Sequence, residues 1–282
     1  QGVLTDGRFR PPQCWIPDTR PRRGHEIVLK SHLHAGFSFR LLKSGRRIAK
    51  TRMPRYDLHC HSTWSDGVLS PGDIVRRAAA QDVDVLALTD HDEVGGLAEA
   101  RQAAADAGIA LVDGVEVSVS YHEETIHVLG FRIDGARPAL VAALAGIRHG
   151  RDARARRISA SLESAGIDGT YDDARALAGN EELISRAHFA RVLVSRGVVR
   201  DTHDCFKSYL VPGKPGYVPH AWPALGEAIA WIRDAGGSAV LAHPGRYRFD
   251  ADAMRGLFAE FRDAGGEGIE VVTPAHTPKQ YV

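Results

Sequence analysis

Residue types that bind metal ions recur at short spacing in the segment 56–67, "YDLHCHSTWSDG". His59 and His61 are two residues apart, and Asp66 follows five residues after the second histidine. On a strand, side chains two apart face the same way, so both histidines would face one side and Cys60 the other. Imidazole and carboxylate ligands without a thiolate favour zinc, manganese or iron. A lone His-x-His is often an ordinary half-buried pair, so this segment needs partners elsewhere in the chain.

Further candidate ligands follow other strand-like stretches. His91 ends "VDVLALTDH", Glu116 lies between valines in "GVEVS", His127 lies in "IHVLG", and His243 begins "HPGR", which ends in Arg246. An unpaired carboxylate in a buried strand is costly, so Glu116 needs a neutralising partner. Functional residues of parallel α/β folds gather at the carboxyl ends of the strands. We therefore predict one polynuclear metal site, in which Glu116 could bridge two ions.

The elements that must position these residues alternate between strand and helix from residue 56 onward. We predict strands in 56–61, 83–90, 109–120, 124–133, 238–245 and 268–273, and helices in 70–82, 96–108, 224–237 and 252–266. Ser70 is suited to cap the first helix, with Pro71 at its first position, and Gly108 ends the second. This alternation predicts an α/β fold with parallel strand pairing through right-handed crossovers.

The alternation breaks between about residues 137 and 222, which we interpret as an inserted helical cap over one end of the sheet or barrel. The segment 137–166 predicts one long helix, 182–197 predicts a second, and 204–222 resembles a loop. The arginine-rich part of the first helix, around 148–157, is expected to be a solvated face, with guidance of an RNA backbone as the lesser alternative.

Composition excludes several classes of protein. No run approaches 18 uncharged apolar residues, so no membrane span is predicted. Cys14, Cys60 and Cys205 are few and scattered among 282 residues, which argues against a disulfide framework and indicates a cytoplasmic protein. Residues 1–55 hold 13 Lys and Arg against 3 Asp and Glu, which leaves 23 basic and 32 acidic residues in the remainder. So acidic a body does not suit a surface that coats nucleic acid.

Residues 1–52 are rich in Arg, Pro and Gly and lack sustained periodicity. We expect Met53 to be the natural start, and 1–54 to be a non-native or disordered basic leader before a domain that spans 55–282. The rival interpretations are a nucleic-acid-binding arm and a transit peptide. The prolines argue against the helix that a transit peptide would form.

The motifs "DLHCHSTWSDG", "ALTDHD", "GVEVS", "IHVLG" and "AHPGR", in this order, resemble those of the PHP family (polymerase and histidinol phosphatase domains). The resemblance covers essentially all of 55–282. It implies a distorted (β/α)7 barrel and a hydrolase with two or three divalent ions: manganese, iron or zinc. It also implies three ligand sets: His59, His61 and Glu116; Asp66 and His91, sharing Glu116; and His127 with His243.

Within the family, "ISRAHFARVLV" and "LVPGKPGYV" resemble a subgroup of phosphoesterases that remove the 3'-phosphate of nucleoside 3',5'-bisphosphates. One branch is also a 5'-3' exoribonuclease acting on short RNA 5' ends, and the implied chemistry uses a metal-activated hydroxide. We expect Arg186, His188 and Arg246 to act on the phosphate, and Lys214, Arg186 and Arg246 to bind the substrate. A solvated helix face for Arg186 and a packed helix residue for His188 remain open alternatives. The expected partner is a nucleotide or short RNA, and no obligate protein partner is indicated.

One departure from the family pattern is a missing Ser-Asp-Phe-His-like motif, which supplies an Asp and a His from a late strand. We therefore expect the chain to be incomplete at its carboxyl end, with impaired activity. Two other functions stay open: an amidohydrolase acting on C–N bonds, and a catalytically impaired metal- or nucleotide-binding module. No lysine ends a strand, as the carbamate bridge of an amidohydrolase would need, and Glu116 takes that place. Asp90 and Asp92 are expected to orient His91 or nearby backbone, whereas His220, Glu270 and His276 are left out of the predicted site.

Overall fold

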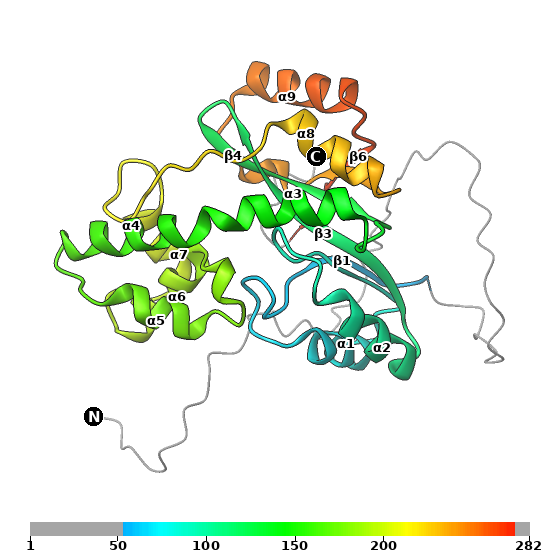
Figure 1. Cartoon of the computed structure of the whole chain (residues 1–282), viewed down its shortest axis with the longest axis horizontal. Coiled ribbons are helices and arrows are strands. Elements are labelled where there is room, and N and C mark those ends of the chain that lie inside the picture. The colour runs from blue at the N-terminus through cyan, green and yellow to red at the C-terminus, as the bar shows by residue number, and fades with distance from the viewer. Residues whose placement is uncertain (1–52, 274–282) are drawn as a thin grey trace, which may run out of the picture. The chain divides into compact units, whose positions relative to one another are not determined.

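A computed structural model describes residues 53–273 of the chain. Its sheet has six strands in chain order: β1 (Tyr56–Cys60), β2 (Val85–Leu88), β3 (Ala110–Tyr121), β4 (Glu124–Phe131), β5 (Ser238–Leu241) and β6 (Gly268–Ile269). All six predicted strands are therefore confirmed. The result is a mixed α/β fold around a curled, half-barrel sheet (Figure 1).

Strand direction differs from the prediction at one strand. β1, β2 and β3 pair in parallel, as do β5 and β6, but β4 is antiparallel to both of its neighbours. Only His122 and Glu123 join β3 to β4, and His122 has a φ of 50°. Two residues can close a hairpin, whereas a parallel crossover needs a dozen or more residues. Uniform parallel pairing was therefore wrong for β4.

Four helices follow the sheet strands: α1 (Pro71–Ala80), α2 (Leu97–Ala107), α8 (Leu225–Asp234) and α9 (Ala251–Asp263). All four predicted helices are confirmed. The Ser70 hydroxyl accepts a hydrogen bond from the Asp73 amide at 3.1 Å, and Gly108 ends α2 at a φ of 71°. No helix in 53–273 is long and apolar enough to cross a membrane.

The inserted region contains more helices than predicted: α3 (Pro138–His149), α4 (Arg151–Glu163), α5 (Thr170–Leu177), the 3₁₀ turn η1 (Glu181–Leu183), α6 (Arg186–Ser195), α7 (Thr202–Cys205) and the π-helical turn η2 (Phe206–Leu210). The single helix expected in 137–166 is divided at Gly150, and the expected loop in 204–222 is partly helical. The second predicted helix corresponds to η1 and α6. A last 3₁₀ turn, η3, spans Pro244–Arg246.

Two hydrophobic clusters stabilise the described chain. The first lies between the sheet and helices α1, α2, α3, α8 and α9, and includes Val75, Leu144 and Leu257. The second joins α4 to η2 and includes Ile158 and Phe189. We call residues 151–218, which form this second cluster, the cap; its helices α4 to α7 gather to one side of the sheet in Figure 1. The cap thus has its own core, whereas α3 packs on the core of the sheet.

Candidate metal centre

Glu116 lies at the centre of the predicted site. Its side chain is only 1% exposed, and it projects from the middle of β3. Five imidazole rings each bring one nitrogen to within 3.3 Å of its carboxylate oxygens: those of His59, His61, His91, His127 and His243. Asp66 approaches the same rings, with its carboxylate 3.3 Å from His61 Nδ1 and 3.9 Å from His91 Nε2. All seven predicted ligand residues thus converge.

The carboxyl ends of the parallel strands explain most of this convergence. His59 lies in β1 and His61 follows it, so alternation turns both rings to one side and leaves Cys60 on the other. The Cys60 thiol indeed donates to the Ala87 carbonyl in the neighbouring strand. His91 follows β2, and it forms an isolated bridge with Glu116. Three adjacent strands therefore deliver these groups to one edge of the sheet.

His127 reaches the same edge by a different route. It lies in the first half of β4, opposite Ser118 of β3. Because β4 runs antiparallel to β3, its amino-terminal half lies beside the carboxyl-terminal half of β3. The Tyr247 hydroxyl accepts from the His127 amide at 2.9 Å and donates to the Ala242 carbonyl at 2.8 Å, which ties β4 to the segment before His243.

Glu270 belongs to the same cluster, so leaving it out was wrong. It follows β6, and its carboxylate lies 3.1 Å from His59 Nδ1 and accepts from the His243 amide at 2.7 Å. His243 has a φ of 28°, a strained conformation for a residue other than glycine. The strand-end rule that located the other ligands also applies to Glu270, and it was the available signal. His276 lies outside the described residues.

The carboxylates and imidazoles of the cluster shift one another's pKa. Burial opposes ionisation of Glu116, but the surrounding histidines outweigh it and hold its pKa well below the usual range. Burial also opposes protonation of His59, yet Glu116 and Glu270 raise its pKa to about 10. Burial likewise opposes protonation of His61, but Glu116 and Asp66 raise its pKa. Burial prevails at two rings, and it lowers the pKa of His91 to about 3 and that of His243 to about 4. These two imidazoles are therefore neutral at pH 7, which is the form that binds metal.

Ring nitrogens of different histidines also lie within hydrogen-bonding distance of one another. His59 Nε2 lies 3.1 Å from His61 Nε2, and His127 Nδ1 lies 3.3 Å from His243 Nε2. Each such contact can hold one proton. His91 Nδ1 is buried and has no hydrogen-bond partner among the described residues, although it lies 3.3 Å from Glu116. Lone pairs that converge without donors are what a cation would satisfy, so the donor set fits metal ions.

Three groups within the described residues have ligand atoms that all lie within 4.8 Å of one another: His59, His61 and Glu116; His61, Asp66 and His91; His91, Glu116 and His127. The first group coincides with an implied ligand set. The second contains the implied pair Asp66 and His91 and adds His61. In the third group His91 replaces His243, which itself lies 3.0 Å from Glu116.

Two aspartates that flank His91 hold neighbouring backbone. Asp90 accepts from the Ser62 amide, the Ser62 hydroxyl and the Ser65 hydroxyl, each at 2.6 Å, and so fixes the loop between His61 and Asp66. Asp92 accepts from the amide of Ser118 at 2.7 Å and from its hydroxyl at 2.9 Å. Neither aspartate is hydrogen-bonded to the His91 ring in these contacts, so they orient backbone around it.

The predicted phosphate-binding residues occupy different environments. His188 is fully buried, and its Nδ1 accepts from the Ser185 amide at 2.9 Å, so its proton is on Nε2. That Nε2 has no partner among the described residues. Burial and the nearby Arg191 lower the pKa of His188 to about 4, and the ring is neutral at pH 7. A neutral imidazole with an unused N–H is a suitable donor to a phosphoryl oxygen.

Arg186 is partly buried and donates to the Leu210 carbonyl at 3.1 Å, so it does not belong to a solvated helix face. Burial lowers its pKa, and the charges of Arg246 and Arg151 add to this effect. Lys214 and Arg246 are exposed. Arg246 ends η3, three residues after His243, and its charge also acts on that histidine.

Arg156 and Arg157 are exposed, as predicted for 148–157, but two other arginines of this segment face inward. Arg151 and Arg154 are only 4% and 6% exposed. Arg151 forms a buried ion pair with Asp92, and Arg154 donates to the Val218 carbonyl at 3.1 Å. Both guanidinium groups lie over the Trp222 ring, at 4.6 and 5.4 Å from its centre. These internal partners explain why the arginines face inward.

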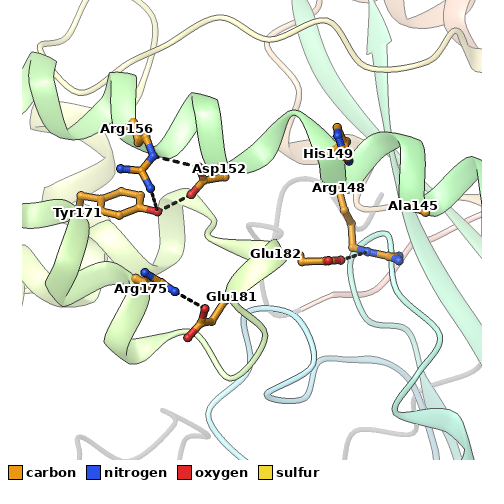
Figure 2. Close-up of a pocket in the computed structure, with 9 residues that line it drawn as sticks. All are labelled: Ala145, Arg148, His149, Asp152, Arg156, Tyr171, Arg175, Glu181 and Glu182. Atoms are coloured by element: carbon orange, nitrogen blue, oxygen red, sulfur yellow. Dashed lines mark hydrogen bonds and ion pairs between the residues drawn. The ribbon is translucent and has the colours of Figure 1, made fainter.

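A separate cavity of about 480 Å³ lies beside the cap (Figure 2). Its lining includes Arg148, Asp152, Tyr171, Arg175 and Glu181, and none of the predicted ligands. Figure 2 shows its charged groups paired with one another across the cavity, for example Arg175 with Glu181. His220 lines a second cavity, where its ring contacts Trp222 at 4.2 Å between centres. Neither cavity contains the convergent donors of the metal centre.

Comparison with known proteins agrees with this geometry. Residues 57–235 match the PHP domain family. A 3',5'-nucleoside bisphosphate phosphatase from Chromobacterium violaceum is 53% identical over 225 residues, which are 80% of this chain and 79% of that protein. A 5'-3' exoribonuclease from Haemophilus influenzae is 45% identical over 226 residues, or 80% of this chain and 82% of that protein. A solved structure of an amidohydrolase from C. violaceum, with bound sulfate and no metal, has a TM-score of 0.79 at 52% identity, and the match covers 80% of each chain. This chain belongs to the PHP domain family and is a metal-dependent phosphoesterase.

Proposed function

We propose that this chain hydrolyses the 3'-phosphate of nucleoside 3',5'-bisphosphates and acts on short RNA 5' ends as a 5'-3' exoribonuclease. Two or three manganese, iron or zinc ions would be held by His59, His61, Asp66, His91, Glu116, His127 and His243. The observation that carries the proposal is a buried carboxylate, Glu116, surrounded by five imidazole nitrogens within 3.3 Å. The names of the two relatives supply the substrate classes.

Divalent ions at such a centre lower the pKa of a bound water and polarise phosphoryl oxygens. The residues of the chain prepare this chemistry. Glu116 stays ionised and would supply negative charge to the bound ions. Glu270 contacts His59 Nδ1, which leaves Nε2 of that ring directed to Glu116. The partly buried Asp66 carboxylate, whose pKa the neighbouring His91 and His61 hold below its usual range against burial, supplies a second negative charge.

Four further residues would bind the phosphates. His188 is suited to donate its Nε2 proton to a phosphoryl oxygen near Asp66, whose charge acts on the His188 ring. Arg186 and Arg246 are cations close enough to influence one another, and among the described residues neither forms an ion pair with a carboxylate. Lys214 lies exposed in a turn whose amide donates to the Val211 carbonyl at 3.0 Å. A bisphosphate needs cations for the phosphate that is not at the metals, and these residues are our candidates.

We further propose that the fold is of the distorted (β/α)7 barrel type and that the protein acts in the cytoplasm, where free thiols such as Cys60 and Cys205 persist.

Release of inorganic phosphate tests the proposal. The chelator-treated chain would be reloaded with Mn²⁺, Fe²⁺ or Zn²⁺ and given adenosine 3',5'-bisphosphate, adenosine 5'-monophosphate or a 5'-phosphorylated tetraribonucleotide. We expect phosphate and adenosine 5'-monophosphate from the bisphosphate, nucleotides from the RNA, and little phosphate from the monophosphate. Ion binding without any phosphate release would indicate a binding module. Hydrolysis of an amide or cyclic C–N substrate in place of the phosphoester would indicate an amidohydrolase.

A further inference from the structure

Four candidate ligands lie outside the strands: His61, Asp66, His91 and His243. Asp66 lies in the loop between β1 and α1, and His91 lies in the loop between β2 and α2. Together with His61 they form one of the three groups of convergent ligand atoms. His59, Glu116 and His127 lie within strands, where the ladder of backbone hydrogen bonds already fixes them. The loop ligands need another source of order.

The Asp66 loop is held from the cap by Arg191 of α6. Arg191 Nη2 donates to the Asp66 carbonyl at 2.8 Å, and Nη1 lies 3.5 Å from the Gly67 carbonyl. These contacts join residues 125 and 124 positions apart in the chain. A planar guanidinium can address two adjacent carbonyls at once, which an ammonium group does poorly. Arg191 therefore fixes the backbone on which the Asp66 carboxylate depends.

The His91 loop is held by two further arginines, one from the cap and one from α3. Arg151 of α4 pairs with the Asp92 carboxylate, which is fully buried, and its Nη2 lies 3.1 Å from the Ser118 hydroxyl. Arg148, in the last turn of α3, donates to the Asp92 carbonyl at 2.8 Å. Asp92 has a φ of 50°, a strained conformation that surrounding contacts must maintain. Both arginines therefore act on the residue next to His91.

We propose that Arg191 and Arg151 are positioning residues that set the His61, Asp66 and His91 metal position, and so couple the occupancy of that one position to the cap. This rests on the metal binding of the proposed function. These cap arginines contact the Asp66 loop and Asp92, whereas His59 and Glu116 of the first ligand group lie in strands. Loosening the cap then releases one ion and leaves the strand-held position intact.

A metal titration of Arg191→Met tests the inference. Methionine keeps the length and packing of the stem but removes both carbonyl contacts. Mn²⁺ would be titrated into chelator-treated protein by calorimetry, and bound Mn²⁺ would be followed by electron paramagnetic resonance. We expect one binding step to weaken about 10- to 100-fold, as loss of a partner that orients a ligand does. The other steps should stay within about two-fold of wild type. Arg151→Lys should weaken the same step.

Arg196→Met is the matched control. Arg196 caps the same helix, α6, but its partners are Asp173 and the carbonyls of Asp168 and Gly169, all inside the cap. It should leave every metal step unchanged, even if it lowers cap stability. Arg191→Lys provides a second, milder variant if the methionine variant does not fold. It should show a partial effect on the same step.

Two results would overturn the inference. One is equal ion affinities in wild type, Arg191→Met and Arg196→Met; the other is a parallel loss of all steps, which would indicate general destabilisation. Failure of the wild-type chain to bind any ion would remove the proposed function together with this inference. Metal binding in wild type with unaltered steps in Arg191→Met would remove the inference alone.

Discussion

Replacing Glu116 with glutamine separates the stability of the metal-free protein from its affinity for ions. Glutamine has nearly the shape of glutamate but no charge. In the metal-free protein the raised pKa of His59, about 10, depends on the carboxylates of Glu116 and Glu270. An imidazole can lose its proton when a carboxylate is removed, so Glu116→Gln leaves no stranded charge. We therefore expect the metal-free variant to stay within about 1 kcal/mol of wild type, since exchanging a buried ion pair for neutral groups is often nearly neutral.

In the metal-bound protein, loss of a proton by an imidazole cannot compensate for the missing carboxylate. Both oxygens of Glu116 face ring nitrogens that could bind different ions, so a neutral amide would leave more than one divalent ion without its shared anion. Removing one partner of a buried charge interaction costs about 3–5 kcal/mol. At about 1.4 kcal/mol per decade, 3 kcal/mol corresponds to roughly 100-fold weaker binding. The structure thus predicts a small effect on the empty protein and a large one on the loaded protein.

Calorimetric Mn²⁺ titration and denaturant unfolding of the chelator-treated protein measure the two quantities. Glu123→Gln is the control, because Glu123 is exposed in the turn that joins β3 to β4 on the same hairpin. The reasoning fails if Glu116→Gln binds Mn²⁺ as tightly as wild type. It also fails if the metal-free variant loses about 3 kcal/mol or more, because Glu116 would then stabilise the fold rather than a metal centre.

Four further predictions use the same structure. Gly67→Ala would place its Cβ 2.1 Å from the His61 carbonyl oxygen and 2.8 Å from the Ser62 carbonyl carbon, so denaturant unfolding should show a loss of about 1–3 kcal/mol. Gly146→Ala, with open space around its Cβ inside α3, should instead raise the free energy of unfolding by about 0.5–1 kcal/mol. A decrease in this free energy would contradict the prediction. The folded pKa of His188 is about 4 against an ordinary 6.5, so the unfolded state binds more protons in that window and stability falls as pH falls through it. His188→Gln keeps the capping box of α6. As pH falls, the stability of this variant should fall less steeply than that of wild type, by up to about 1.4 kcal/mol per pH unit. Identical slopes in the two proteins would refute the assignment. Mn²⁺ at 100 times its Kd should raise the unfolding free energy by about 2.7 kcal/mol over the chelator-treated protein, and a midpoint insensitive to Mn²⁺ would exclude binding to the folded state.

The sequence was sufficient to bring the candidate ligands together because most of them follow or lie in a strong strand pattern. Alternation in β1 pairs His59 with His61, and a carboxylate between valines marks Glu116 as unusual. Glu270 was left out although the strand in 268–273 was predicted, because nothing in that short stretch indicated its contacts with His59 and His243. A lone acidic residue after a short apolar run resembles many surface residues.

The direction of β4 and the role of the cap arginines depend on contacts between distant segments. His127 lies near the start of β4, and only antiparallel pairing brings that start beside the carboxyl-terminal half of β3. Arg151 and Arg154 follow an arginine-rich pattern that is typical of a solvated helix. Their burial depends on Asp92, Val218 and Trp222, and residue spacing along α4 carries no information about partners so far away.

The "TDHD" stretch shows how a local motif can order a site made of distant parts. An ionised carboxylate in a dry interior is costly unless several donors surround it. Asp90 is surrounded by three donors from the His61 side, and burial still raises its pKa. Asp92, on the other side of His91, accepts hydrogen bonds from the Ser118 amide and hydroxyl and pairs with Arg151. His91, between them, therefore has each neighbour anchored to a different ligand-bearing segment. Loss of either carboxylate would free one flank of His91, so the two aspartates act on the metal centre through the backbone that they hold.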